Sequence, residues 1–225
     1  MNRWTAQLQH HDRSQWLAFV DANSGLPGPR ANTSLAIALA ALADSDLVEQ
    51  LLSSDDEYRV MCGAICVGAR VADADTHARL QALAVDERWR VREGVVIGMQ
   101  EAADTDLGIV QSVVRSWASQ PDPLIARAAV ATICEPRLLR SPAAAAIAIE
   151  VCGRASTVLT NTPRATRRSP AARALRQALG YCWSVAVAAD PHPGLAAFNA
   201  LDITDPDLEW IVRSNRGKKR LQRLL

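Results

Sequence analysis

Basic side chains gather at two places in the second half of the sequence, and their possible chemistry is the most evident in the chain. The first cluster consists of Arg164, Arg167, Arg168, Arg173 and Arg176. The second lies at the end of the chain and consists of Arg213, Arg216, Lys218, Lys219, Arg220 and Arg223. Such groups bind nucleic-acid phosphates by charge and by releasing the counterions around them. The alternative interpretation is a solvated surface, with the terminal cluster favourably placed at the negative end of a helix dipole.

The charge of the chain is unevenly distributed. Residues 1–136 carry 11 Lys and Arg against 18 Asp and Glu, a net charge of −7. Residues 137–225 carry 14 against 6, a net charge of +8, so that the whole chain is nearly neutral at +1. This asymmetry indicates an anionic partner for the second half of the chain.

One tryptophan lies among basic residues. Trp89 stands between Arg88 and Arg90 at the expected start of a helix. An aromatic side chain beside arginines can stack on nucleic-acid bases. The alternative is a large apolar side chain that fills the core, which is the interpretation we favour for Trp183 and Trp210 in their apolar surroundings.

The sequence contains no familiar motif for catalysis or for metal binding. It has no nucleophile elbow, Walker A loop, zinc-protease helix or Gly-rich dinucleotide motif. Cys62 and Cys66 share a helical face, but no histidine lies near them in the sequence. We therefore expect no metal and no cofactor, and we favour a non-catalytic function over an enzymatic one.

Composition indicates a folded, helical protein of the cytoplasm. The chain has 225 residues, of which 49% are hydrophobic and 4% aromatic, and alanine supplies much of the apolar share. These values exclude a disordered chain and favour helices over a sandwich or barrel. No apolar run approaches ~18 residues, so no membrane partner is expected. The five cysteines include no Cys-x-x-Cys pair, and the N-terminus has no secretory signal, so we expect buried free thiols in a reducing compartment.

Several helix starts are marked by a short oxygen-bearing side chain followed by proline. The first residue can cap the helix and the proline suits the first helical position. The pattern predicts helices beginning at Pro123, Pro142, Pro170, Pro191 and Pro206, with a sixth at Pro29. In the same way, Asp46 and Glu49 resemble a capping box. Roughly ten to twelve helices joined by short turns are expected.

An internal repeat is visible in the first part of the chain. Residues 55–64, 86–95 and 121–130 align, and a weaker copy begins at residue 27. Aligned on Arg30, Met61, Arg92 and Arg127, the copies are spaced by 31, 31 and 35 residues. Each copy is a turn followed by two helices, and such a pair must stack on its neighbours to bury both faces. Gly94 and Gly98 indicate a closely packed neighbouring helix.

This spacing resembles the HEAT-like repeat family, in which an Asp-containing turn precedes a Val-Arg pair. Asp86 with Val91-Arg92 is the best match, and Asp122 with Ala126-Arg127 is the next. The resemblance implies an all-α fold, a HEAT-like α-solenoid of stacked antiparallel helix pairs. It implies one domain over 1–225, with capping helices in 1–26, the clearest repeats in 27–135 and basic helix pairs in 136–225.

The repeated arginines allow two interpretations. Arg30, Arg92 and Arg127 can bind carbonyls or acids of the repeat turns, or they can line a binding surface. Because a site is seldom built identically in each repeat, we expect the structural role.

Two functions follow for the whole chain. The first is a scaffold that binds a protein partner or duplex DNA, with Trp89, Lys218, Lys219, Arg220 and the first basic cluster as the candidate nucleic-acid contacts. The sequence does not distinguish this scaffold from a repeat-type chaperone or lyase subunit that acts on another protein. The second function rests on a similarity to the bacterial HEAT-like alkylpurine DNA glycosylases. The nearest counterpart of that family's tryptophan and acidic residue is Trp89 with Glu93.

Overall fold

A computed structural model describes residues 3–225, and all regular secondary structure in these residues is helical. They form fourteen α-helices and three 3-10 helices without a strand, and 72% of the chain is helix. The expected all-α class is confirmed. There are more α-helices than the ten to twelve expected, because short segments such as α14 (Lys219–Gln222) also form a turn of helix. The chain divides into two compact units, unit 1 up to Thr105 and unit 2 from Asp106.

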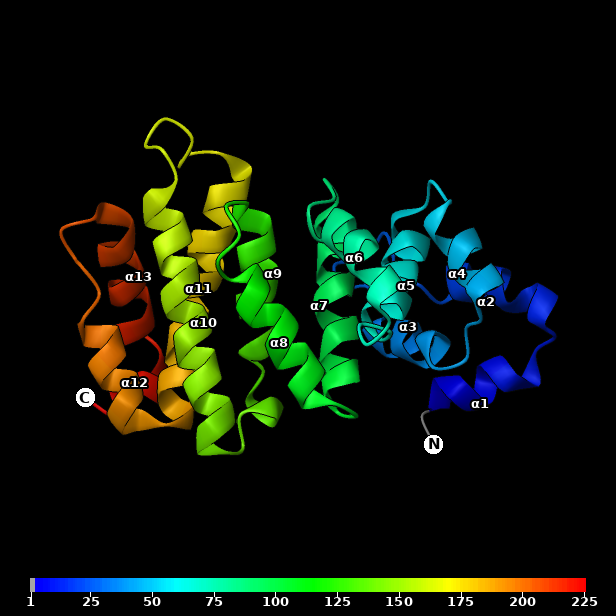
Figure 1. The fold of residues 1–225 in the computed structure, drawn as a ribbon. Coiled ribbons are helices and arrows are strands. Elements are labelled where there is room, and N and C mark those ends of the chain that lie inside the picture. The colour runs from blue at the N-terminus through cyan, green and yellow to red at the C-terminus, as the bar shows by residue number, and fades with distance from the viewer. Residues whose placement is uncertain (1–2) are drawn as a thin grey trace. The chain divides into compact units, whose positions relative to one another are not determined.

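Unit 1 contains seven α-helices (Figure 1). They are α1 (Arg3–His10), α2 (Trp16–Ala22), α3 (Thr33–Ala40), α4 (Ser45–Leu52), α5 (Glu57–Gly68), α6 (His77–Ala84) and α7 (Trp89–Ala103), with short 3-10 turns at Arg13–Gln15 and Ala74–Thr76.

Unit 2 contains the other seven α-helices and one 3-10 turn at Pro136–Leu138. The α-helices are α8 (Leu107–Trp117), α9 (Pro123–Ile133), α10 (Pro142–Asn161), α11 (Pro170–Ala189), α12 (Pro191–Asn199), α13 (Pro206–Arg216) and α14. The expected single repeat domain over 1–225 stays a prediction, and the boundary between the units falls inside its 27–135 segment.

The predicted proline starts of α9 to α13 are confirmed. In α10, for example, the Ser141 hydroxyl accepts the backbone N–H of Ala144. The prediction at Pro29 is wrong, because Asn32 caps the helix and α3 begins only at Thr33. The capping box at Asp46 is also wrong, because Asp44 accepts the N–H of Leu47 and α4 begins one residue later.

In unit 1, the helices α5 and α7 pack very closely, as the small residues predict. A Cβ atom at Gly94 would lie 2.7 Å from the carbonyl oxygen of Met61. A Cβ at Gly98 would lie 2.3 Å from the carbonyl oxygen of Ile65, which is closer than atoms can approach. The two helices lie at aligned positions of two predicted repeat copies and are in direct contact.

The turn before α7 is held by arginines. Nη1 of Arg92 donates to the carbonyl oxygens of Asp86 (2.5 Å) and Glu87 (2.9 Å). Arg88 donates from Nε and Nη2 to the Asp86 carboxylate, and these bonds hold the pKa of Asp86 below its ordinary value. The structural role predicted for Arg92 is confirmed, although its side chain is half-buried rather than largely buried as expected. Arg30, at the aligned position of the weaker copy, is exposed.

In unit 2, α11 lies at the centre and packs against α9, α10, α12 and α13 (Figure 1). Trp183 on α11 is fully buried, as predicted, and its indole N–H donates to the Ser156 hydroxyl of α10. Phe198 of α12 packs against the same indole with ring centroids 5.6 Å apart. This central contact joins three helices.

A buried asparagine joins α13 to α11. Oδ1 of Asn215 accepts the backbone N–H of Ser184, and Nδ2 donates to the carbonyl oxygens of Leu179 and Ile211. The side chain is completely buried and satisfied. It fixes α13, and with it the acidic start of that helix, against α11.

One helix of the described residues, α10, is long and apolar enough to cross a membrane by length and composition alone. Ten of its residues are buried, and it packs against α9 and α11. Within unit 2 it therefore serves as a core helix.

Candidate functional site

The first basic cluster lies on the loop between α10 and α11 and on the first turns of α11. Local sequence signals fix both ends of this loop. Thr162 precedes a proline and is extended, which ends α10, and the Ser169 hydroxyl accepts the N–H of Ala172 to begin α11. Figure 1 shows it as the yellow loop joining the two helices. We call residues 162–169 the basic loop.

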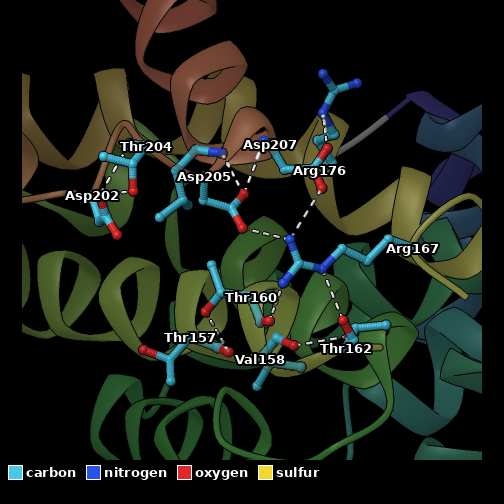
Figure 2. Close-up of polar contacts among 11 residues, drawn as sticks. Thr157, Val158, Thr160, Thr162, Arg167, Arg176, Asp202, Thr204, Asp205 and Asp207 are labelled. Carbon is cyan, nitrogen blue, oxygen red and sulfur yellow. Dashed lines mark hydrogen bonds and ion pairs between the residues drawn. The ribbon is translucent and has the colours of Figure 1, made fainter. Parts of the chain in front are cut away.

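Arg167 anchors the basic loop to the rest of unit 2 (Figure 2). Its Nε donates to the carbonyl oxygen of Thr162 (2.8 Å), its Nη2 donates to that of Thr160, and its Nη1 donates to Oδ2 of Asp205 (2.5 Å). The side chain is only 12% exposed. The guanidinium is thus occupied inside the protein, and Arg167 is a structural residue rather than a contact for phosphates.

The carboxyl group of Asp205 is matched to this arginine. Burial by itself raises its pKa, but hydrogen bonds from Arg167 and from the backbone N–H groups of Asp207 and Leu208 outweigh burial. The pKa therefore lies below its ordinary value, and Asp205 remains charged opposite Arg167. The same carboxylate caps α13, so one ion pair fixes both the loop and the start of that helix.

Arg176 is also occupied inside unit 2. Its Nε lies 2.9 Å from Oδ1 of Asp207, and its guanidinium lies 4.0 Å from the ring centroid of Trp210. Trp210 in turn packs against Gly180, where a Cβ would lie 2.6 Å from the indole. Arg176 therefore joins α11 to α13 instead of facing a partner.

The other three residues of the cluster face solvent. Arg164, Arg168 and Arg173 are exposed, and none of them pairs with a carboxylate of residues 3–225. The structure thus separates the predicted cluster into two arginines that hold the fold and three that are available to bind an anion. We call these three residues the exposed triad.

Two of the three predicted terminal contacts, Lys218 and Arg220, lie beside the exposed Tyr181. Nη2 of Arg220 donates to the Tyr181 hydroxyl (2.7 Å), and its guanidinium lies 4.8 Å from the ring centroid. Nζ of Lys218 lies 5.8 Å from the same ring, whereas Lys219 is exposed. Arg220 and Lys218 are therefore partly engaged with α11, and Lys219 is the most accessible of the three.

Trp89 belongs to unit 1 and is 55% exposed, so it does not fill the core. The guanidinium of Arg90 lies 4.7 Å from its ring centroid, and Nη1 of Arg90 lies 2.8 Å from Oε2 of Glu57. Unit 1 has 9 Lys and Arg against 15 Asp and Glu, a net charge of −6. The predicted aromatic contact thus lies in the acidic unit, apart in sequence from the basic loop.

The five cysteines are free thiols and are buried, as the sequence predicts. Burial raises the pKa of Cys66 to about 12, so this thiol is not a nucleophile at neutral pH. The sulfur atoms of Cys134 and Cys152 lie 3.6 Å apart in the core of unit 2. Residues 3–225 contain no group of three His, Cys, Asp or Glu side chains placed to hold a metal ion.

Two features of this region escape a reading of the sequence. The pairing of Asp205 and Asp207 with the arginines of the cluster joins positions that lie 38 and 31 residues apart. No local pattern marks such a pair. Tyr181 was missed although a signal was present: it lies two i,i+4 steps after Arg173 along α11, and both residues are exposed.

Comparisons with known proteins give no further guide to function. A scan against protein-family models, a search of curated proteins and a search of solved structures each found no match.

Proposed function

We propose that the protein is a non-catalytic helical-repeat scaffold that binds nucleic acid through phosphate contacts in unit 2. The observation that carries this proposal is the division of the basic cluster. Asp205 and Asp207 neutralise Arg167 and Arg176, so the charges of Arg164, Arg168 and Arg173 remain in solvent. No Asp or Glu occurs in residues 151–189 to offset them.

The charge of the whole unit supports the same function. Unit 2 has 16 Lys and Arg against 9 Asp and Glu, a net charge of +7. A field of this sign raises the rate of encounter with a polyanion, and the exposed guanidinium groups supply the contacts. Contacts of this kind bind duplexes of different sequence equally well, because they touch the backbone and not the bases.

The HEAT-like architecture is part of the proposal. The close packing of α5 on α7 and the bonds from Arg92 to the preceding turn fit repeats that stack through equivalent helices. A scaffold of this kind presents its partner with a fixed set of side chains rather than an enclosed catalytic centre.

The proposal is tested by fluorescence anisotropy with labelled duplex DNA at low salt, with the full-length protein. We expect micromolar binding that weakens at least tenfold when Arg164, Arg168 and Arg173 are all changed to alanine. The matched control changes Arg3, Arg13 and Arg30 of unit 1 to alanine, which removes the same charge from exposed positions. Absence of binding by the wild type, or an equal loss in both variants, would contradict the proposal.

A further inference from the structure

A pocket of about 420 Å³ opens beside the basic loop in unit 2. Its wall includes Thr162, Thr166 and Ser169 of the loop, together with Ser119 before α9 and Asn161 at the end of α10. Three prolines, a valine and Ala171 supply the remaining surface. The lining therefore contains both polar and apolar side chains but no charged one. We call this cavity the loop pocket.

The hydroxyl groups of the loop pocket have defined hydrogen-bonding capacity left over. Thr162 uses its hydrogen to bind the carbonyl oxygen of Val158, and Thr166 uses its own to bind that of Pro163. Both oxygens therefore retain lone pairs and can only accept further bonds. Ser169 accepts the N–H of Ala172, so its own hydrogen remains available for donation.

The hydroxyl oxygens of Thr162 and Thr166 cannot bind an ionised phosphate, whose oxygens only accept hydrogen bonds, whereas Ser119, Asn161 and Ser169 supply donors. This mixture suits a neutral group that carries donors as well as acceptors, such as a sugar hydroxyl or the amino group of a base. The apolar part of the wall provides a surface for the ring of such a group.

Cationic side chains border the loop pocket along the chain. Arg164 directly follows the lining residue Pro163, and Arg168 directly precedes the lining residue Ser169. The one carboxylate that directly neighbours the lining in sequence is Asp122, and its Oδ1 accepts the N–H of Leu124 as the cap of α9. The uncharged pocket can hold a neutral ring, and the two exposed arginines next to its lining residues can bind phosphates joined to that ring.

We propose that the loop pocket receives the sugar and base of one unpaired nucleotide, while Arg164 and Arg168 bind the phosphates on either side. This inference rests on the proposed function and specifies its partner as nucleic acid with an unpaired nucleotide. Arg167 prepares the site in advance, because its bonds to the carbonyl oxygens of Thr160 and Thr162 fix one wall (Figure 2).

The experiment compares three labelled DNAs by fluorescence anisotropy with the full-length protein. They are a blunt duplex, the same duplex with a short single-stranded end, and that end with abasic sugars in place of its nucleotides. We expect the tailed duplex to bind about tenfold more tightly than the abasic one, as burial of one base allows. The abasic and blunt DNAs should bind with similar affinity, because both offer backbone phosphates and neither offers an unpaired base.

Ala171→Trp tests the pocket without altering charge, because Ala171 lines it in the first turn of α11. It should abolish the preference for the tailed duplex and leave affinity for the blunt duplex unchanged. Ala143→Trp is the matched control, since Ala143 also follows Ser-Pro at a helix start but is exposed on α10. Thr166→Val, which removes one acceptor at nearly constant shape, should weaken the preference at least threefold, on the order of one lost hydrogen bond.

The outcomes separate this inference from the proposed function. Equal affinity for the tailed and abasic DNAs, with blunt-duplex binding intact, would overturn the inference alone. A tail preference that survives Ala171→Trp would also overturn it. Displacement of tailed DNA by a phosphoserine peptide from the wild type but not from Ala171→Trp would assign the pocket to a protein partner instead. Absence of binding to every DNA would overturn the proposed function as well.

Discussion

The two units of this protein use arginine in different ways. In unit 1, arginines pair with carboxylates across neighbouring elements, as in Arg59 with Asp21, Arg79 with Glu49 and Arg90 with Glu57. In unit 2, Arg167 and Arg176 pair with Asp205 and Asp207, but the basic residues outnumber the acidic ones and the exposed triad remains without such partners. The carboxylates within reach of each arginine, and not the number of arginines, therefore decide which arginines can bind a partner.

The largest effect should come from the buried arginine of unit 2. Arg167→Ala removes the partner of Asp205 and three hydrogen bonds, so it should lower the free energy of unfolding by about 2–4 kcal/mol. Arg164→Ala, three residues away in the same loop, should change it by less than about 0.5 kcal/mol. Urea unfolding followed by circular dichroism measures both. Equal small effects would show that the two arginines do not differ in role.

The corresponding change in unit 1 should have a smaller effect. Arg92→Ala leaves the carbonyl oxygens of Asp86 and Glu87 without their donor, so we expect a loss of about 1–3 kcal/mol. Arg30→Ala, at the aligned position of the weakest repeat, is the control, because Arg30 is exposed and should tolerate the change. The midpoint of thermal unfolding is measured for both variants. An unchanged midpoint for Arg92→Ala would contradict the structural role of the repeated arginine.

Acid should destabilise the protein through its paired carboxyl groups. The pKa values of Asp86 in unit 1 and Asp205 in unit 2 lie below their unfolded values. Each group therefore contributes stability that is fully present above about pH 4 and is lost as pH falls through the folded-state pKa. Asp205→Asn should be less stable than the wild type at pH 7, and the difference should shrink toward pH 3. A constant difference in urea midpoints across this range would contradict the assignment.

Much of the fold could be predicted from the sequence, because its determinants are local. A capping side chain followed by proline marks the starts of α9 to α13, and small residues on α7 mark its contact with α5. The failures at Pro29 and Asp46 are local as well, since Asn32 and Asp44 supply better-placed caps nearby. The boundary between the units at Thr105 depends on which helices pack together. The repeat pattern continues across this boundary, so the sequence does not indicate it.

The candidate site could be predicted only in part. Composition placed a basic cluster at residues 164–176, but spacing alone does not distinguish Arg167 from Arg168. The distinction depends on Asp205, which α12 and the following turn bring back to the loop from 38 residues away. The loop pocket is likewise formed by two segments of unit 2, residues 119–123 and 158–171, so no single pattern in the sequence indicates it.

The smallest effects should come from Trp89, because it lies in the acidic unit. Trp89→Ala should change the affinity for duplex DNA by less than about twofold, since it removes no phosphate contact. In a scaffold without catalytic activity, neither the wild type nor Glu93→Gln should release bases from alkylated DNA. Base release that Trp89→Ala and Glu93→Gln abolish while the fold is retained would instead support the glycosylase alternative.

The salt dependence of DNA affinity tests the central claim most directly. Between about 50 and 200 mM salt, the logarithm of the association constant should fall linearly with the logarithm of salt concentration, with a slope of about −0.9 for each phosphate bound. Replacing Arg164, Arg168 and Arg173 with alanine should make the slope less negative by roughly 3, whereas the unit 1 control variant should keep the wild-type slope. Equal slopes for the wild type and the Arg164/Arg168/Arg173 variant would show that these arginines do not contact phosphates.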